Sequence, residues 1–328
     1  MLPFTICTIP YFHFAEYQRF FRWTLSFALL LTICLGPRVA NAEDEPSTER
    51  LILMCSTTQI ADFARQVVGD RMDVQCILTP GQDPHMYEVT PSDAQRVASA
   101  DLCLQNGMHL EGKNWMQTLA DDENKPVVTC TTGVQPIILE EEGKETKIED
   151  PHAWFSPRNA LLYTRNVLTA VSELDPDHKS EYEARTALFF DQIRALDAWI
   201  KRQVNAIPVE RRVLVTSHDA FNYFCRDFNF QSQSPAGWST GPEIGGGPTP
   251  AKRKETVESI RTTGVKAIFV ETSTNPKLIR IIAQEAGVVV GGTLYSDSMG
   301  DAGSAGETYI GMMRENVLTI VTSLTRQP

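Results

Sequence analysis

Histidine is scarce in this chain, which has six among 328 residues. No two cysteines have the C-x-x-C spacing, so a zinc cluster held by thiolates is not expected. The chain also lacks the H-E-x-x-H pattern that is typical of many zinc hydrolases. The glycine run at 245–247 is not followed by Lys and Ser or Thr, which argues against a phosphate-binding loop. A metal site in this protein would have to be assembled from distant parts of the chain.

Basic residues are outnumbered in the sequence. The 30 Lys and Arg stand against 41 Asp and Glu, which gives a formal net charge of −11. An acidic chain of this kind is a poor nucleic-acid binder, so no nucleic-acid partner is expected. The overall negative field mildly favours cations, although a general surface charge does not define a specific site.

A hydrophobic run long enough to cross a bilayer comfortably is also missing, because the apolar stretch at residues 23–35 is short. Arg19 and Arg22 precede it, and an Ala40-x-Ala42 pattern suited to signal peptidase follows it. We therefore predict a cleaved signal peptide over residues 1–42 and a soluble periplasmic protein. A lipoprotein anchored at Cys34 is the less favoured alternative, because the bulky Thr32 and Ile33 precede that cysteine where small residues are usual.

Cleavage after Ala42 would leave 328 − 42 = 286 residues, enough for two lobes with cores of their own. The removed segment carries three Arg and one Glu, so the mature charge would be −11 − 2 = −13. Five cysteines would remain: Cys55, Cys76, Cys103, Cys130 and Cys225. Four of them lie in or at the ends of predicted strands, which favours buried free thiols. A Cys55–Cys103 disulfide is an alternative if their strands are neighbours.

The mature chain alternates short β-rich runs with helical patterns, which is typical of βα units around parallel sheets. We predict an α/β fold of two lobes, each with a parallel β-sheet flanked by helices. The N-terminal lobe is predicted over residues 43–175 and the C-terminal lobe over 208–328. The predicted strands cover residues 51–56, 72–78, 101–105, 127–130, 212–217, 266–272 and 288–295.

Residues 176–207 are predicted to link the lobes through one long helix. Apolar residues recur there at helical spacings from Tyr182 to Val204, and neither Gly nor Pro interrupts roughly 28 residues. At 1.5 Å per residue such a helix is about 40 Å long. A rigid strut between the lobes and an ordinary core helix both explain this length, and the pattern alone does not choose between them.

Two of the six histidines end the same tripeptide, Asp-Pro-His, at residues 83–85 and 150–152. Proline biases the preceding Asp towards extended geometry, which would hold the histidine in place before a metal arrives. A third histidine, His218, directly follows an apolar run at residues 213–217. Taken singly, each of these histidines is more simply explained as solvated or hydrogen-bonded; their shared setting in loops is what indicates a joint metal site.

The carboxyl ends of parallel strands are where ligands bind in open α/β sheets. His85, His218 and Asp297 each follow a predicted strand, and His152 precedes a helix predicted to begin near residue 156. Three imidazoles and one carboxylate would suit Zn²⁺ in tetrahedral geometry, or Mn²⁺ or Fe²⁺ if the carboxylate binds through both oxygens. Protons would compete for such a site as the pH falls through the ordinary histidine range, from about 7 to 5.

Six stretches of the chain resemble the metal-cation class of ABC-importer substrate-binding proteins, the TroA-like zinc and manganese family. They are residues 81–88 (GQDPHMYE), 106–111 (NGMHLE), 150–154 (DPHAW), 216–221 (TSHDAF), 269–273 (FVETS) and 294–301 (LYSDSMGD). They span almost the whole mature chain in family order. The resemblance implies two α/β lobes joined by a long helix, with metal ligands at His85, His152, His218 and Asp297. It further implies delivery of the ion to a membrane permease with its ATPase, by a protein that is not an enzyme and is expected to be a monomer.

One departure bears on which metal is bound. Zinc-dedicated members of that family often carry a His-rich loop before the second ligand, whereas residues 140–145 here hold four Glu, one Gly and one Lys. Some manganese members have Glu where this chain has His218. The three-histidine set therefore resembles members that accept both metals.

Two functions of other classes stay open at this point: an exported zinc-dependent hydrolase and a metal-binding surface adhesin. The hydrolase is disfavoured because catalytic zinc usually keeps one position open for water, while four ligands are predicted here. Of the other polar residues near the predicted site, Glu271, Asp219 and Asp301 are candidates to orient a ligating imidazole. Trp154 is expected to pack against the site, His109 to lie at the surface, and His178 to be solvated.

Overall fold

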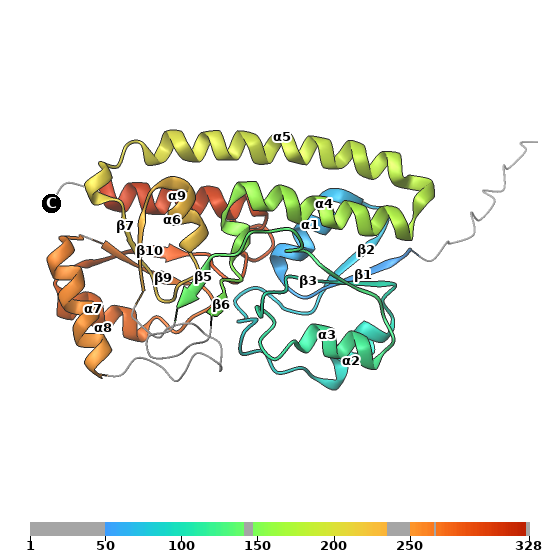
Figure 1. Ribbon diagram of the computed structural model, residues 1–328, viewed down its shortest axis with the longest axis horizontal. Coiled ribbons are helices and arrows are strands. Elements are labelled where there is room, and N and C mark those ends of the chain that lie inside the picture. The colour runs from blue at the N-terminus through green and yellow to red at the C-terminus, as the bar shows by residue number, and fades with distance from the viewer. Residues whose placement is uncertain (1–49, 141–146, 235–249, 266, 326–328) are drawn as a thin grey trace, which may run out of the picture. The chain divides into compact units, whose positions relative to one another are not determined.

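The computed structural model describes residues 50–325, with gaps at 141–146, 235–249 and 266. Its first part holds a four-stranded parallel sheet in the order β2-β1-β3-β4 (Figure 1). The strands are β1 Ile52–Cys55, β2 Asp73–Cys76, β3 Leu102–Gln105 and β4 Val127–Thr129. The helices around it are α1 Thr58–Val68, α2 Pro91–Ala98, α3 Trp115–Asp122 and α4 Pro157–Leu174. Apolar residues of α1 and α4 cover one face of the sheet, and those of α2 and α3 cover the other.

The later part of the chain repeats this plan with two parallel strand pairs. The strands are β7 Val213–Val215, β8 Gln231–Gln233, β9 Ala267–Glu271 and β10 Val289–Leu294. β7 pairs with β8, β9 pairs with β10, and β7 also lies against β9. The helices are α6 Asn222–Phe228, α7 Pro250–Thr263, α8 Lys277–Ala286 and α9 Tyr309–Thr325. The predicted fold class, parallel sheets flanked by helices in both parts of the chain, is confirmed.

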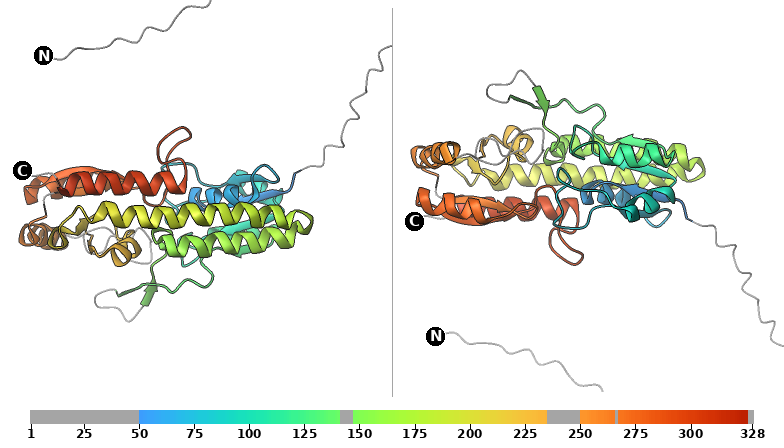
Figure 2. Two further views of the ribbon diagram at one scale, coloured as in Figure 1. Left: turned by 90° about the horizontal axis from the view of Figure 1, so that it is seen from above. Right: turned by 90° about the horizontal axis from the view of Figure 1, so that it is seen from below.

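Between these parts the chain forms α5, Lys179–Val204, a helix of 26 residues preceded by the 3₁₀ turn η2, Pro176–His178. α5 packs against α1 and α4 of the first part and against α6 and α9 of the second. Figure 2 shows α5 running beside both α4 and α9. The sequence left two explanations for this long helix, a strut between the lobes and an ordinary core helix. Both describe α5, which connects the two parts and also packs in the core. The exact lobe boundaries remain a prediction.

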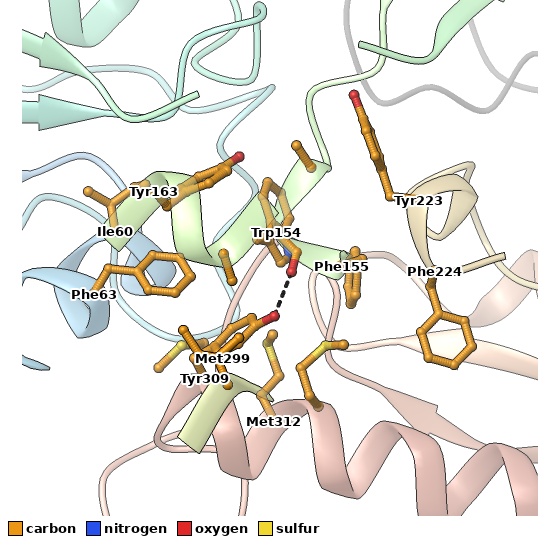
Figure 3. Close-up of a cluster of buried hydrophobic side chains, with 14 of the residues drawn as sticks. Ile60, Phe63, Trp154, Phe155, Tyr163, Tyr223, Phe224, Met299, Tyr309 and Met312 are labelled. Carbon is orange, nitrogen blue, oxygen red and sulfur yellow. Dashed lines mark hydrogen bonds between the residues drawn. The ribbon is translucent and has the colours of Figure 1, made fainter. Parts of the chain in front are cut away.

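One apolar cluster extends through both parts of the chain, which together form one compact unit, Glu49–Pro328. At its centre the ring of Phe63 lies 5.4 Å from that of Tyr163 and 5.0 Å from that of Tyr309. The Tyr309 hydroxyl donates a hydrogen bond of 2.9 Å to the carbonyl of Trp154 (Figure 3). Residues from α1, α4 and α9 thus meet directly behind the segment that carries His152.

A small antiparallel hairpin was not predicted. It pairs β5, Ile138–Glu140, with β6, Lys147–Glu149, and these two strands flank the acidic stretch that follows residue 140. Short 3₁₀ turns complete the described elements: η1 Ala153–Phe155 and η3 Val209–Arg211. Strand β8, three polar residues long, was also missed.

The five cysteines that the structure describes are free thiols, as expected; four of them are buried, whereas Cys76 is half-buried. The alternative Cys55–Cys103 disulfide is wrong, although β1 and β3 are indeed neighbours. Cys55 packs into the cluster beneath α1, whereas Cys103 packs into the cluster beneath α2 and α3. The two side chains lie on opposite faces of one sheet, so no bridge can join them.

Candidate metal centre

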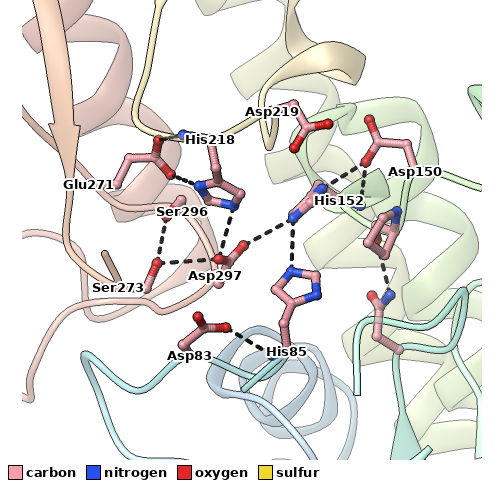
Figure 4. Close-up of polar contacts among 12 residues, drawn as sticks. Asp83, His85, Asp150, His152, His218, Asp219, Glu271, Ser273, Ser296 and Asp297 are labelled. Atoms are coloured by element: carbon pink, nitrogen blue, oxygen red, sulfur yellow. Dashed lines mark hydrogen bonds and ion pairs between the residues drawn. The ribbon is translucent and has the colours of Figure 1, made fainter. Parts of the chain in front are cut away.

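Four buried side chains converge where the two parts of the chain meet: His85, His152, His218 and Asp297 (Figure 4). Each offers one ligand atom, and these four atoms all lie within 4.8 Å of one another. They come from four separate segments, namely the loop after β2, the residues before η1, the loop after β7 and the loop after β10. The structure therefore brings together the whole set predicted from the sequence.

The spacing of the ligand atoms fits a shared ion. His152 Nε2 lies 3.3 Å from His85 Nε2 and 3.3 Å from Asp297 Oδ1. His218 Nε2 lies 3.1 Å from Asp297 Oδ2. Two ligands held about 2.1 Å from one ion at a tetrahedral angle are about 3.4 Å apart. Because the two oxygens of Asp297 face different histidines, this carboxylate is also placed to bind an ion through both.

Each Asp-Pro-His tripeptide folds into the same local turn. The backbone N–H of His85 donates to Asp83 Oδ1 at 2.9 Å, and that of His152 donates to Asp150 Oδ1 at 3.0 Å. A carboxylate that accepts from the backbone two residues later closes an Asx turn. The Asp of the tripeptide, together with the stiffness that Pro supplies, therefore sets the direction in which the histidine leaves the chain.

Carboxylates also fix the imidazoles of two of the histidines. Asp150 Oδ1 lies 2.8 Å from His152 Nδ1, and Glu271 Oε2 lies 2.5 Å from His218 Nδ1. Glu271 holds the backbone of His218 as well, accepting its N–H at 3.0 Å. With Nδ1 engaged in this way, Nε2 of each ring is left to face the centre, the usual arrangement behind metal-bound histidines.

The sequence identified some of these supporting residues and missed others. Glu271 was a candidate and contacts His218. Asp301 is exposed, and within the described part of the chain Asp219 forms no hydrogen bond or ion pair with a ligating ring. Asp150 was missed in this role, although its signal was present as the Asp-x-His spacing. Ser273 was missed too: its hydroxyl donates to Asp297 Oδ2 at 3.3 Å, and nothing in its sequence setting marks it.

The structure agrees with the expectations for Trp154 and His109 and corrects the one for His178. The Trp154 ring packs against His152, with centroids 5.4 Å apart. His109 is exposed, as expected. His178, expected to be solvated, is half-buried and pairs with Asp175 at 2.9 Å.

Burial and neighbouring charges shift the pKa values of the three histidines in different directions. Burial lowers the pKa of His85 to about 3, despite the opposing charge of Asp297. Burial also disfavours the charged form of His152, but hydrogen bonds to Asp150 and Asp297 outweigh it and raise its pKa to about 9. For His218, burial is likewise outweighed, by Asp297 and Glu271, so its pKa is raised. Burial and the Asp297 charge raise the pKa of Asp83 to about 6.

The sequence model of the ZnuA family, described as the periplasmic component A of a zinc-uptake complex, matches residues 53–323. The chain belongs to the ZnuA family. This family consists of binding components for metals and not of enzymes, so the hydrolase alternative is discarded.

Relatives of known role match nearly the whole chain. SsaB of Streptococcus sanguinis, a metal ABC transporter substrate-binding lipoprotein, is 33% identical over 305 residues, 91% of this chain and 97% of its own. PsaA of Streptococcus pneumoniae serotype 4, named for manganese, is 32% identical over 309 residues, 92% and 98% of the two chains.

Solved structures of ZnuA-like proteins share the fold. The periplasmic zinc-binding protein TroA of Treponema pallidum superposes with a TM-score of 0.77 at 32% identity, covering 84% of this chain and all of that one. A manganese-bound periplasmic protein of Candidatus Liberibacter asiaticus gives a TM-score of 0.74 at 28% identity, with the same coverage.

Proposed function

We propose that the protein captures one divalent transition-metal ion with His85, His152, His218 and Asp297 and delivers it to the membrane permease of an ABC importer, which its ATPase drives. The observation that carries this proposal is the convergence of four buried ligand atoms within 4.8 Å of one another. Membership of the ZnuA family supports the transport role. The cargo is held between two lobes, which we take as residues 43–175 and 208–328, linked by residues 176–207.

Zinc and manganese are the metals we propose, and Fe²⁺ fits the same donors. Three imidazole nitrogens and one carboxylate oxygen make a complete tetrahedral zinc set. If both oxygens of Asp297 bind, the same residues supply five donors, which suits Mn²⁺ and Fe²⁺. Because Zn²⁺ binds a given nitrogen and oxygen site more tightly than Mn²⁺, selection of manganese in the cell would also depend on which ion is available.

Export to the periplasm through the cleaved signal peptide at residues 1–42 is part of the proposal, and so is a monomeric state. Residues 1–49 lie outside the part that the structure describes. Among the residues it does describe, no helix has the length and apolarity needed to cross a bilayer. Several relatives are named lipoproteins, so the competing anchor at Cys34 has a direct test. The mass of the mature protein shows either an N-terminus at residue 43 or a lipid-modified Cys34.

The function is tested by measuring bound metal. Protein purified from its native compartment is expected to carry about one ion per chain, and the element found identifies the cargo. His218→Ala is expected to lose this ion, because it removes a ligand and leaves Glu271 without its partner. His109→Ala is the matched control, since it removes an exposed histidine and is expected to retain the ion. Equal metal content in both variants would overturn the site.

The surface-adhesin alternative remains a separate prediction. Binding to host matrix that persists in His218→Ala would support it, since that activity would not need the ion.

A further inference from the structure

The three histidines of the proposed site are held in different ways. His152 and His218 each have a carboxylate at Nδ1, whereas Nδ1 of His85 makes no hydrogen bond to any residue that the structure describes. His85 is also the most exposed of the four proposed ligands, at 6% against 1% for the others. Among the described residues, no carboxylate holds the ring of His85 directly, so the direction of this ring depends on how the backbone around it is held.

The backbone next to His85 is held instead by Trp115, the first residue of α3. The indole Nε1–H of Trp115 donates to the carbonyl of Pro84 at 3.0 Å, and this bond is buried. Trp115 itself is 6% exposed, with its ring 5.3 Å from that of Tyr87. A buried indole N–H needs an acceptor, and among the described residues Trp115 finds it in the carbonyl directly before the ligand.

Gly112 packs closely against the carbonyl group of His85. Its φ of +44° lies in the left-handed region, and a Cβ placed there would be 2.4 Å from the carbonyl oxygen of His85. A side chain at this position would push that carbonyl away. The absence of one lets the segment of Gly112 lie directly on the backbone of His85.

We propose that Trp115 and Gly112 are positioning residues that set the metal affinity through the backbone of His85. They take the place of the carboxylates that orient the other two histidines. This inference rests on the proposed function and extends it to residues that touch neither the ion nor a ligating ring nitrogen.

Trp115→Phe tests the inference, because it keeps an aromatic ring and removes the indole N–H. Loss of an outer-shell partner commonly weakens a metal site by about 10- to 100-fold, and we expect about a tenfold weaker Zn²⁺ affinity. Trp199→Phe is the matched control. Trp199 lies on α5, which carries none of the proposed ligands, and the Arg314 guanidinium lies 5.0 Å from the centroid of its ring. We expect its affinity to stay within about twofold of wild type.

The route through His85 is tested by repeating Trp115→Phe in a His85→Ala background. There the second substitution is expected to change the affinity no further, because the ligand it positions is gone. The visible absorption of Co²⁺ bound in place of Zn²⁺ gives a reading of ligand geometry that a general loss of stability would not move. We expect a changed spectrum for Trp115→Phe and an unchanged one for Trp199→Phe.

Gly112→Ala provides a second variant if Trp115→Phe does not fold. It is expected to lower the affinity more than tenfold, because the methyl group displaces the His85 carbonyl. Equal losses in the two Trp variants, or an undiminished loss in the His85→Ala background, would overturn the inference. A wild-type protein that binds no ion would overturn the proposed function first, whereas tight binding in wild type and in Trp115→Phe alike would overturn only this inference.

Discussion

Glu271 supports one proposed ligand at two points, because its carboxylate contacts both the backbone N–H and the ring Nδ1 of His218. The Glu271 side chain is buried, so solvent cannot replace His218 as its partner. A ligand supported in this way presents Nε2 in one direction and loses little entropy on binding an ion. The affinity of the site is therefore expected to depend on residues that never touch the metal.

Glu271→Gln is expected to weaken Zn²⁺ binding by about 10- to 100-fold. The amide has one acceptor in place of two, so it cannot hold both the backbone and the ring of His218. Competition with a chelator of known affinity measures the change. Glu258→Gln, at an exposed position of α7, serves as the control and should bind like wild type. Unaltered affinity in Glu271→Gln would show that the contact does not orient the ligand.

Metal binding is expected to be steeply pH-dependent, and over a higher range than the ordinary histidine pKa predicts. In the metal-free protein the carboxylates hold the pKa of His152 at about 9 and raise that of His218. Both rings are then protonated at neutral pH and must release their protons to the solvent when the ion binds. Affinity therefore rises with pH through neutrality, by about two logarithmic units per pH unit while both rings are protonated. His85, with a pKa near 3, adds no competition there.

Titrations with Zn²⁺ at about pH 6, 7 and 8 check this dependence, as does calorimetry in buffers of different ionisation enthalpy, which counts the released protons. Asp150→Asn should flatten the profile, because it removes a carboxylate that keeps His152 protonated. A profile confined to the range from pH 7 to 5, as first expected from ordinary histidines, would mean that the carboxylates do not control the rings.

The four proposed ligands could be predicted from the sequence because three of them are histidines, of which the chain has six, and all four lie just after a strand or just before a helix. The residues that hold these ligands in position were harder to identify. Asp150 could have been found from the Asp-x-His spacing, but Trp115 and Ser273 are ordinary residues whose role depends on what the folded chain places beside them. Contacts of this kind depend on tertiary structure and have no local sequence signal.

At the scale of single elements, α2 shows how local chemistry fixes a helix start next to the site. Thr90 accepts the backbone N–H of Asp93, while the Asp93 side chain accepts that of Thr90 at 2.9 Å, and Pro91 follows the cap. This capping box terminates the loop that carries His85. Threonine followed by proline is a sequence pattern typical of a helix start, so this element has a clear local signal.

Thr90→Ala is expected to lower the free energy of unfolding by about 1 kcal/mol, because one backbone N–H of α2 loses its acceptor. Denaturant unfolding of the metal-free protein measures this change. Thr169→Ala is the control: this exposed threonine lies inside α4, and its hydroxyl donates to the carbonyl of Arg165. Alanine is a better helix former, so the control should be neutral or slightly stabilising. An equal loss in both variants would mean that the cap contributes nothing.

Long periodic elements were predictable and short polar ones were not. The pattern from Tyr182 to Val204 indicated α5 to within a few residues, because seven buried positions recur on one helix face. β8 has the sequence Gln-Ser-Gln and β5 and β6 have three residues each, so no alternation of apolar and polar residues could reveal them. Such strands form because a neighbour supplies hydrogen-bond partners, not because of their own propensity.

At the scale of the whole described chain, the two parts are joined by more than a linker. α5 packs on helices of both, and Tyr309 at the start of α9 is held by Asp62 of α1 and by Trp154 of η1. The backbone N–H of Met299 also donates to Thr58 at 2.9 Å. The parts therefore share one core next to the site, which limits how far they can move apart when an ion enters.

This shared core leads to a prediction about unfolding. The metal-free protein is expected to unfold in one cooperative transition, with equal calorimetric and van't Hoff enthalpies, because neither part can lose the cluster around Phe63 alone. An ion that binds only the folded state should shift that whole transition, by about 4 kcal/mol at a free concentration a thousandfold above its dissociation constant. His218→Ala should remove the shift while keeping the single transition. Two separate transitions, only one of them moved by the ion, would mean that the parts fold independently and that the site does not bridge them.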